Sequence, residues 1–137
     1  MPIAVRVVSV ERSIFEGDAE FIKARSTGGE LGILPRHSPL LAVLSPGELR
    51  IDKTGGGSEL IFVGGGFMEV LPERVTILAD VAEHADDINV DRAEESRRHA
   101  TERLQGQVDE GERRSLELEL LMAEERLRLA RVRRGGG

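Results

Sequence analysis

The sequence contains no cysteine, tryptophan or tyrosine, and phenylalanine occurs only four times. Without cysteine the chain can form no disulfide, no thiol nucleophile and no cysteine-ligated zinc site. The longest apolar runs, such as Leu40–Leu44 and Leu60–Val63, are far shorter than the roughly 20 residues of a membrane-spanning helix. The N-terminus lacks the charged start and long apolar segment of a secretory signal, so we expect the protein to lie inside the cell.

Patterns typical of catalysis or metal binding are equally scarce. The three histidines, His37, His84 and His99, have no spacing that resembles a metal motif. No serine lies in a Gly-x-Ser-x-Gly elbow. The run Gly64–Gly66 lacks the downstream Gly-Lys-Ser/Thr of a P-loop, which favours a tight turn between strands. We therefore predict a protein that is not an enzyme and holds no metal or resident cofactor.

The first part of the chain consists of short runs rich in β-branched residues, separated by glycine and proline turn signals. Turn signals of defined chemistry are Glu16-Gly17-Asp18, Gly28-Gly29, Ser45-Pro46-Gly47, Thr54–Ser58, Gly64–Gly66 and Pro72-Glu73. Many short strands with this spacing predict an antiparallel sandwich or barrel. The expected strands cover Ile3–Val10, Phe21–Ala24, Leu40–Leu44, Glu48–Ile51, Leu60–Val63, Phe67–Leu71 and Val75–Leu78.

The composition changes after Asp86-Asp87, because residues 89–134 contain no proline and are dominated by glutamate, arginine, leucine and alanine. We therefore divide the chain into a β domain, residues 1–87, and a helical domain, residues 88–137. Asn89 is the expected N-cap of a first helix that ends near Gln105. A polar link between Gly106 and Gly111 then leads to a second helix from about Glu112. The fold class is accordingly α+β, a β domain followed by an antiparallel two-helix hairpin.

The second helix carries an apolar seam with steps of four and three residues: Leu116, Leu120, Ala123, Leu127 and Ala130. The first helix offers mostly small residues opposite this seam, so the two backbones can approach closely: Val90, Ala93, Ala100, Leu104 and Val108. Further apolar residues remain outside the seam: Leu118, Leu121, Met122, Leu129 and Val132. Either the β domain or a partner protein must cover them.

The net charge is −6, but the last helical turns are strongly basic. No acidic residue follows Glu125, whereas five arginines do: Arg126, Arg128, Arg131, Arg133 and Arg134. Nucleic acid is not the expected partner, because the overall charge is negative and aromatic stacking platforms are absent. An acidic protein surface fits this basic end better.

Longer strings of residues resemble a known family. The segment Gly29–Leu41 (GELGILPRHSPLL), followed by Ser45-Pro46-Gly47, closely resembles the signature of the ε subunit of F-type ATP synthases of the bacterial type. The resemblance continues in register through Val63–Val70, Val75–Asp80 and Glu83–Ala93. Arg36 stands where the family usually has glycine.

This resemblance implies a β-sandwich of about ten strands with a C-terminal helical hairpin, in a non-catalytic subunit of the rotating central stalk. It implies partners in the γ subunit, the c-ring and the catalytic β subunit, at the cytoplasmic face of the bacterial plasma membrane, where the protein is peripheral. Glu30 and His37 match the family's c-ring contact loop. The basic end (Arg126, Arg128, Arg131 and Arg133) matches the family's inhibitory tip, which blocks ATP hydrolysis when the hairpin extends.

Some bacterial members of the family bind ATP in the hairpin, and the resemblance places a partly lost version of that motif here. The matching positions are Glu83, Ile88, Asn89, Arg92, Ala93 and Arg126. Asn89 replaces an acid, while His99 and Met122 stand where binding members carry arginine. Loss of two cations and a carboxylate should weaken phosphate binding strongly, so we predict weak or absent ATP binding. A free-standing nucleotide-sensing module is the alternative function.

Overall fold

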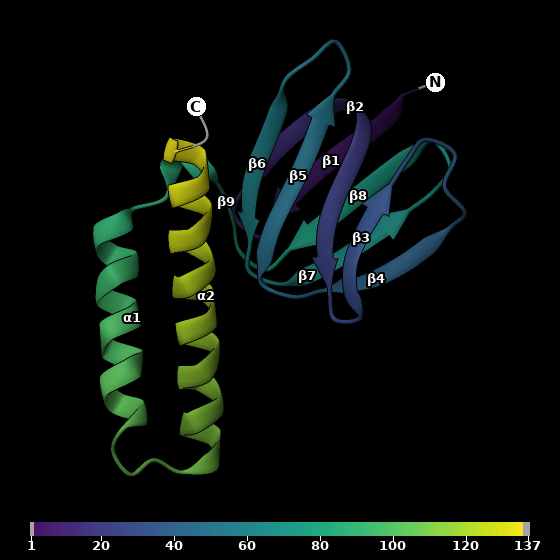
Figure 1. Cartoon of the computed structure of the whole chain (residues 1–137). Coiled ribbons are helices and arrows are strands. Elements are labelled where there is room, and N and C mark those ends of the chain that lie inside the picture. Colours follow the sequence, from purple (N-terminus) through teal and green to yellow (C-terminus); the bar gives the residue numbers. More distant parts are fainter. Residues whose placement is uncertain (1, 136–137) are drawn as a thin grey trace. The chain divides into compact units, whose positions relative to one another are not determined.

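The structure, a computed structural model, describes residues 2–135 and divides into two compact units, Met1–His84 and Ala85–Gly137. The first unit is a β-sandwich and the second a helical hairpin (Figure 1), which confirms the predicted α+β class. Nine strands are present in the described residues, where the resemblance implied about ten. They are β1 Ile3–Ser9, β2 Ser13–Ser26, β3 Gly29–Ile33, β4 Leu40–Leu44, β5 Gly47–Lys53, β6 Ser58–Val63, β7 Gly66–Val70, β8 Arg74–Ala79 and β9 Ala82–His84.

The strands form two layers that are joined through the long strand β2. The order of hydrogen-bonded neighbours is β1-β8-β7-β4-β2-β5-β6-β9, with β3 also paired to β2. In Figure 1, β1, β8, β7 and β4 lie behind β5, β6 and the end of β2. The first half of β2 pairs with β1, and its second half pairs with β3 and β5. All pairs are antiparallel except β1–β8, which is parallel.

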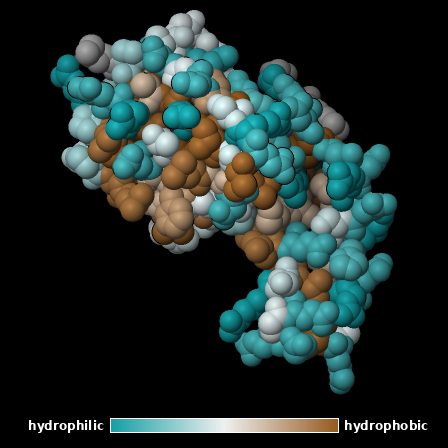
Figure 2. All heavy atoms as spheres, turned by 180° about the vertical axis from the view of Figure 1, so that it is seen from behind, coloured by the Kyte–Doolittle hydropathy of each residue, from teal (hydrophilic) through white to brown (hydrophobic). Residues whose placement is uncertain are grey.

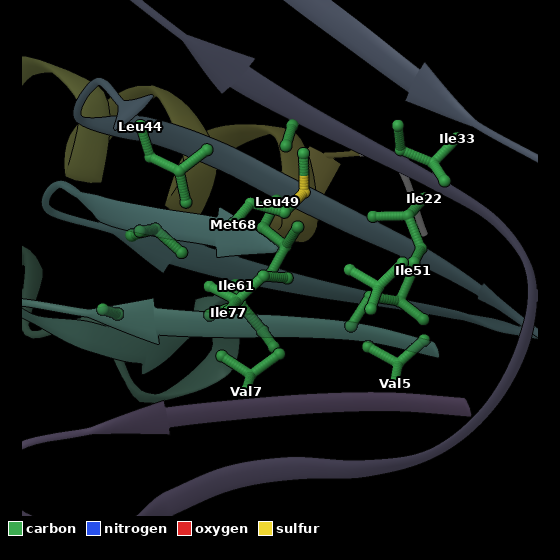
Figure 3. Close-up of a cluster of buried hydrophobic side chains, with 14 of the residues drawn as sticks. Val5, Val7, Ile22, Ile33, Leu44, Leu49, Ile51, Ile61, Met68 and Ile77 are labelled. Carbon is green, nitrogen blue, oxygen red and sulfur yellow. The ribbon is translucent and has the colours of Figure 1, made fainter. Parts of the chain in front are cut away.

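Alternation of side chains along the strands builds the core between the layers. In β1, Ile3, Val5 and Val7 are buried while Ala4 and Arg6 are exposed, the period of two that a half-buried strand requires. The core is almost entirely aliphatic: Figure 3 shows Ile22, Ile51 and Ile77 among the side chains that meet there. A core of branched aliphatic side chains explains how a chain with so few aromatics can fold.

The run Gly64–Gly66 forms the turn between β6 and β7, as the sequence indicated. Gly66 has a φ of 132°, in the left-handed region. A Cβ atom at this position would lie 2.1 Å from the carbonyl oxygen of Leu78. Only glycine fits there, because both the backbone conformation and the close approach of β8 exclude a side chain.

The second unit begins with a short 3-10 helix, η1 Ala85–Asp87, followed by α1 Val90–Leu104 and α2 Glu110–Gly135. The predicted cap is confirmed, because the backbone N–H of Arg92 donates to the side-chain oxygen of Asn89 over 3.1 Å. The second helix starts two residues before the expected Glu112. Asp109 caps it by accepting from the backbone N–H of Glu112 over 2.8 Å, which places Gly111 inside the first turn.

The helices α1 and α2 pack against each other along the predicted seam. In α2, Leu116, Ala123, Leu127 and Ala130 are buried and Leu120 is half-buried. From α1 the buried residues are Ala93 and Ala100. Small side chains on one helix therefore meet leucines on the other, which permits a close approach.

Candidate interaction sites

Glu30 lies beside the turn that joins β2 to β3. The buried Ser26 braces this turn: its hydroxyl donates to the carbonyl oxygen of Gly29 over 2.7 Å and accepts from the N–H of Gly28 over 3.1 Å. Glu30 is exposed, pairs with Arg25 across the strands, and has the Lys23 ammonium 4.0 Å from its carboxylate. The turn therefore presents a fixed, charged side chain to the surface.

His37 lies in residues 34–39, the loop between β3 and β4, and its neighbour Arg36 has an unusual backbone. Arg36 is the one non-glycine residue of the described chain with positive φ, at 66°. Its N–H donates to the carbonyl oxygen of Pro72 in the β7–β8 turn over 2.9 Å. Glycine at this position would adopt this conformation without strain.

The structure does not bring Glu30 and His37 together. Glu30 lies at the start of β3, where Ser26 pairs with Gly29 and with Leu44 of β4. His37 follows the other end of β3, next to the loop residue that is bound to the β7–β8 turn. Because a strand of five residues separates these ends, the two contact candidates belong to opposite ends of the sandwich.

Four exposed apolar side chains share the outer face of β4, β7 and β8, and we call them the outer-face patch: Leu41, Val43, Phe67 and Leu78. Val43 pairs with Phe67, and Phe67 with Leu78, so the three form a row across the strands. Figure 2 shows brown side chains gathered on the sandwich in the view from behind. Our strand predictions missed this surface, although apolar residues at consecutive positions of Leu40–Leu44 were a signal for it, since such a strand is apolar on both faces.

The basic end of α2 is partly engaged within its own unit. Arg128 donates to Glu125 over 3.0 Å. Arg133 donates to Asp86 of η1 through two nitrogens, over 2.8 and 3.3 Å. Arg126 is half-buried and Arg131 is exposed. The side chain of Arg134 lies outside the described part of the structure. The predicted tip therefore contains two arginines that already hold carboxylates of this chain.

Several residues at the positions of the nucleotide motif make structural contacts within the hairpin. Asn89 caps α1, and Ile88 and Ala93 are buried. Nδ1 of His99 lies 3.2 Å from a carboxylate oxygen of Glu119, which also accepts from the hydroxyl of Ser96 over 3.1 Å. Arg92 is exposed, and three other residues are half-buried: Glu83, Met122 and Arg126. Position 99 thus joins α1 to α2 through a carboxylate, which is not an arrangement that attracts phosphate.

A separate charged group stands on β5 and β6. The Arg50 Nε donates to Asp52 over 2.8 Å, and the hydroxyl of Ser58 donates to the same oxygen over 2.7 Å. The hydrogen bond from Arg50 and then that from Ser58 lower the pKa of the Asp52 carboxyl, and the same pairing raises the pKa of Arg50. These contacts brace the outer face of the strand pair.

Within residues 2–135 there is no group of three or more histidine, aspartate and glutamate side chains that could hold a metal ion. None of the helices in that part of the chain is long and apolar enough to cross a membrane. The surfaces that are present, an apolar row on a sheet and charged turns and helix ends, define a protein-binding module.

The comparisons with known proteins agree with this class. Residues 2–85 match the family described as ATP synthase, Delta/Epsilon chain, beta-sandwich domain. The ATP synthase epsilon chain of Herpetosiphon aurantiacus is 44% identical over 134 residues, which is 98% of each chain. That of Acidithiobacillus ferridurans is 48% identical, over 98% of this chain and 93% of its own. The chain belongs to the ATP synthase epsilon chain family and is a non-catalytic subunit, which confirms the prediction from the sequence.

Two solved structures resemble the fold. A chain of the mitochondrial ATP synthase of Euglena gracilis, in a structure of its OSCP, F1 and c-ring part, superimposes with a TM-score of 0.81 at 25% identity, over 90% of this chain and 78% of that one. A chain of the central stalk and c-ring of Tetrahymena thermophila ATP synthase has a TM-score of 0.69 at 15% identity, over 95% and 97%. The second likeness supports the fold alone.

Proposed function

We propose that this chain is a rotor subunit of a proton-translocating ATP synthase, which links the catalytic head to the c-ring through the central stalk. The observation that carries the proposal is the similarity to epsilon chains over 98% of the sequence. In this role the sandwich binds the γ subunit and the c-ring. The helical unit that follows it is regulatory. The subunit is then peripheral, on the cytoplasmic face of a bacterial plasma membrane.

The outer-face patch is the surface on which γ docks. Exposed apolar rows of this kind are typical of protein interfaces, and an apolar partner surface would remove Phe67 and Leu78 from water. Leu78→Glu should therefore abolish binary binding between the purified chain and γ, measured by calorimetry. The matched control is Leu34→Glu, at an exposed leucine in the β3–β4 loop outside the patch. Equal affinities of the two variants for γ would contradict this assignment.

The c-ring contact involves Glu30, His37 or both, and their positions at opposite ends of β3 make the two separable. Because the chain has no cysteine, Glu30→Cys and His37→Cys each introduce a single thiol. In the assembled complex, a short cross-linker should join at least one of these positions to a ring carrying a cysteine in its polar loop. Arg6→Cys, at an exposed position in the middle of β1, is the control. The assignment fails if neither position gives a product above that control.

The hairpin inhibits ATP hydrolysis when its basic end reaches an acidic segment of the catalytic β subunit. Such a hairpin can fold onto its own sandwich or extend along γ, and the same apolar seam is covered in both arrangements. A small free-energy difference therefore selects between them. Arg128→Glu with Arg131→Glu should relieve inhibition in a reconstituted complex. The control reverses Arg113 and Arg114 at the other end of α2. If hydrolysis stays equally suppressed in both double variants, the inhibitory role of the tip is wrong.

ATP binds this hairpin weakly or not at all, because His99 and Met122 replace cations and Asn89 replaces a carboxylate. Calorimetry with the isolated chain tests this directly, and micromolar affinity for ATP would overturn it. The triple variant Asn89→Asp, His99→Arg and Met122→Arg should gain affinity. Aspartate caps helices as well as asparagine does, so the first of these changes keeps α1 intact.

A further inference from the structure

The open end of the hairpin, opposite the loop of residues 105–109, is closed by a contact between distant parts of the sequence. Arg133 near the end of α2 and Asp86 of η1 are 47 residues apart, and they meet through two hydrogen bonds of 2.8 and 3.3 Å. Nε bonds one carboxylate oxygen and Nη2 the other, so the planar guanidinium grips the carboxylate as a fork.

We propose that the pair Asp86–Arg133 is a clasp that holds the hairpin closed and competes with the acidic partner surface for the arginine tip. This inference rests on the proposed inhibitory function of the hairpin. Within this chain, the carboxylate of Asp86 binds Arg133 in the way that an acidic residue of the partner would. Arg133 cannot grip both carboxylates in the same fork geometry, so closing the clasp removes one of the tip's cations from the inhibitory surface.

The placement of Asp86 is well determined by its neighbours. Ala85 and Ile88, on either side of the two aspartates, are 5% and 3% exposed, so η1 is anchored by buried side chains. Helix η1 also packs against α2. The backbone that carries the Asp86 carboxylate is therefore held by buried neighbours, so forming the fork costs mainly the side-chain freedom of Arg133 and Asp86.

The described side-chain hydrogen bonds and ion pairs between α1 and α2 lie farther toward the loop end of the hairpin than the clasp does. Ser96 and His99 meet Glu119, and Arg103 forms a very short ion pair with Glu112. The clasp therefore adds a polar contact at the open end, where Ala93, Leu127 and Ala130 supply buried apolar packing.

The strength of the clasp suits a switch. The side chains of Arg133 and Asp86 are 45% and 65% exposed, so water and salt screen the pair. An exposed pair of this kind shifts an equilibrium by about two- to five-fold. That is enough to bias the hairpin toward closure and small enough for a competing acidic surface to overcome.

The test compares Asp86→Asn with Asp87→Asn in the full chain. The two acids are adjacent, exposed members of η1, but only Asp86 has a described bond to Arg133. Amide hydrogen exchange across residues 126–135 should rise about two- to five-fold in Asp86→Asn and stay unchanged in Asp87→Asn. The exchanged pair Asp86→Arg with Arg133→Asp should restore protection. Unchanged exchange in Asp86→Asn, or no restoration in the exchanged pair, overturns the clasp.

A second readout in the reconstituted complex separates the clasp from the proposed function. Asp86→Asn should strengthen inhibition of ATP hydrolysis, because it releases Arg133 to the partner, and Asp87→Asn should not. If exchange rises but inhibition is unchanged, competition with the partner is overturned while the clasp stands. Failure of the proposed function itself is recognised by the tip reversal, Arg128→Glu with Arg131→Glu, which leaves Asp86 and Arg133 in place.

Discussion

The sandwich and the hairpin are held together in different ways. The sandwich buries large aliphatic side chains from nearly every strand, and Ile22, Ile51 and Ile77 have no exposed surface. The hairpin buries alanines of α1 and leucines of α2 along one seam, and side-chain hydrogen bonds and ion pairs that are partly exposed also join its helices. Elements with few buried apolar contacts open more readily than closely packed cores. This difference supports the proposal that the sandwich binds partner subunits and that the hairpin changes its arrangement.

The largest effect that tests this difference between sandwich and hairpin is expected when a buried leucine of each unit is replaced by alanine. Leu49 in β5 is 1% exposed and Leu116 in α2 is 6% exposed. Leu49→Ala should lower the free energy of unfolding of the sandwich by about 2–5 kcal/mol in urea denaturation, because it leaves a cavity in a core closed on all sides. Leu116→Ala should raise amide exchange only in residues 90–135. Loss of protection in the strands of Leu116→Ala would show that the units are not independent.

Overpacking of the hairpin should have the next largest effect. Ala100 has no exposed surface and lies where α1 approaches α2. Ala100→Leu should force the helices apart and cost about 1–3 kcal/mol of hairpin stability. Glu95→Leu, an exposed position on the same helix, introduces the same side chain without this cost. Hydrogen exchange of α1 and α2 measures both, and equal protection in the two variants would contradict a close-packed seam.

The features that the sequence predicted well are local ones. The β-branched run Ile3–Val10 predicts the strand β1, and the chemistry of Asn89 predicts where α1 begins. The sequence predicts a start for α2 that is two residues late, because Gly111 indicates a boundary before Glu112. The adjacent Asp109 provides a cap that tolerates glycine in the first turn.

The features that the sequence did not predict depend on contacts between residues that are far apart in the sequence. Strand β2 extends over Ser13–Ser26, well beyond the expected Phe21–Ala24 and through the turn expected at Glu16-Gly17-Asp18, because backbone pairing with β1 stabilises its first half. The outer-face patch needs the register of three strands before Phe67 and Leu78 become neighbours. The bond between Arg133 and Asp86 likewise exists only once the hairpin has returned α2 to η1.

A smaller effect is expected from the strained backbone of the sandwich. A residue with a side chain in the left-handed region costs about 1–2 kcal/mol, whereas glycine loses roughly 0.5–1 kcal/mol through its freedom in the unfolded chain. Arg36→Gly should therefore raise the free energy of unfolding in urea by at most about 1.5 kcal/mol. Arg6→Gly, at an exposed position in the regular strand β1, should lower it instead. A loss of stability in Arg36→Gly would mean that the arginine side chain makes a compensating contribution.

The smallest effect concerns acid stability, to which the sandwich contributes through Asp52. Because hydrogen bonds from Arg50 and Ser58 lower the pKa of this carboxyl in the folded state, its stabilising contribution is complete above the ordinary carboxyl pKa. It is lost as the pH falls through the lowered value. The side chains of Arg50 and Asp52 are 46% and 34% exposed, so solvent screening limits the contribution to less than about 1 kcal/mol.

Asp52→Asn should therefore narrow the difference in urea midpoint between neutral pH and about pH 3, where most carboxylates are protonated. Asp18→Asn, an exposed acid on β2, serves as the matched control. The change should appear in the unfolding of the sandwich and leave amide exchange in α1 and α2 unaltered, since Asp52 belongs to the first unit. If the difference in urea midpoint narrows equally in both variants, the acid sensitivity comes from the net charge of the protein and not from the hydrogen bonds that Arg50 and Ser58 donate to Asp52.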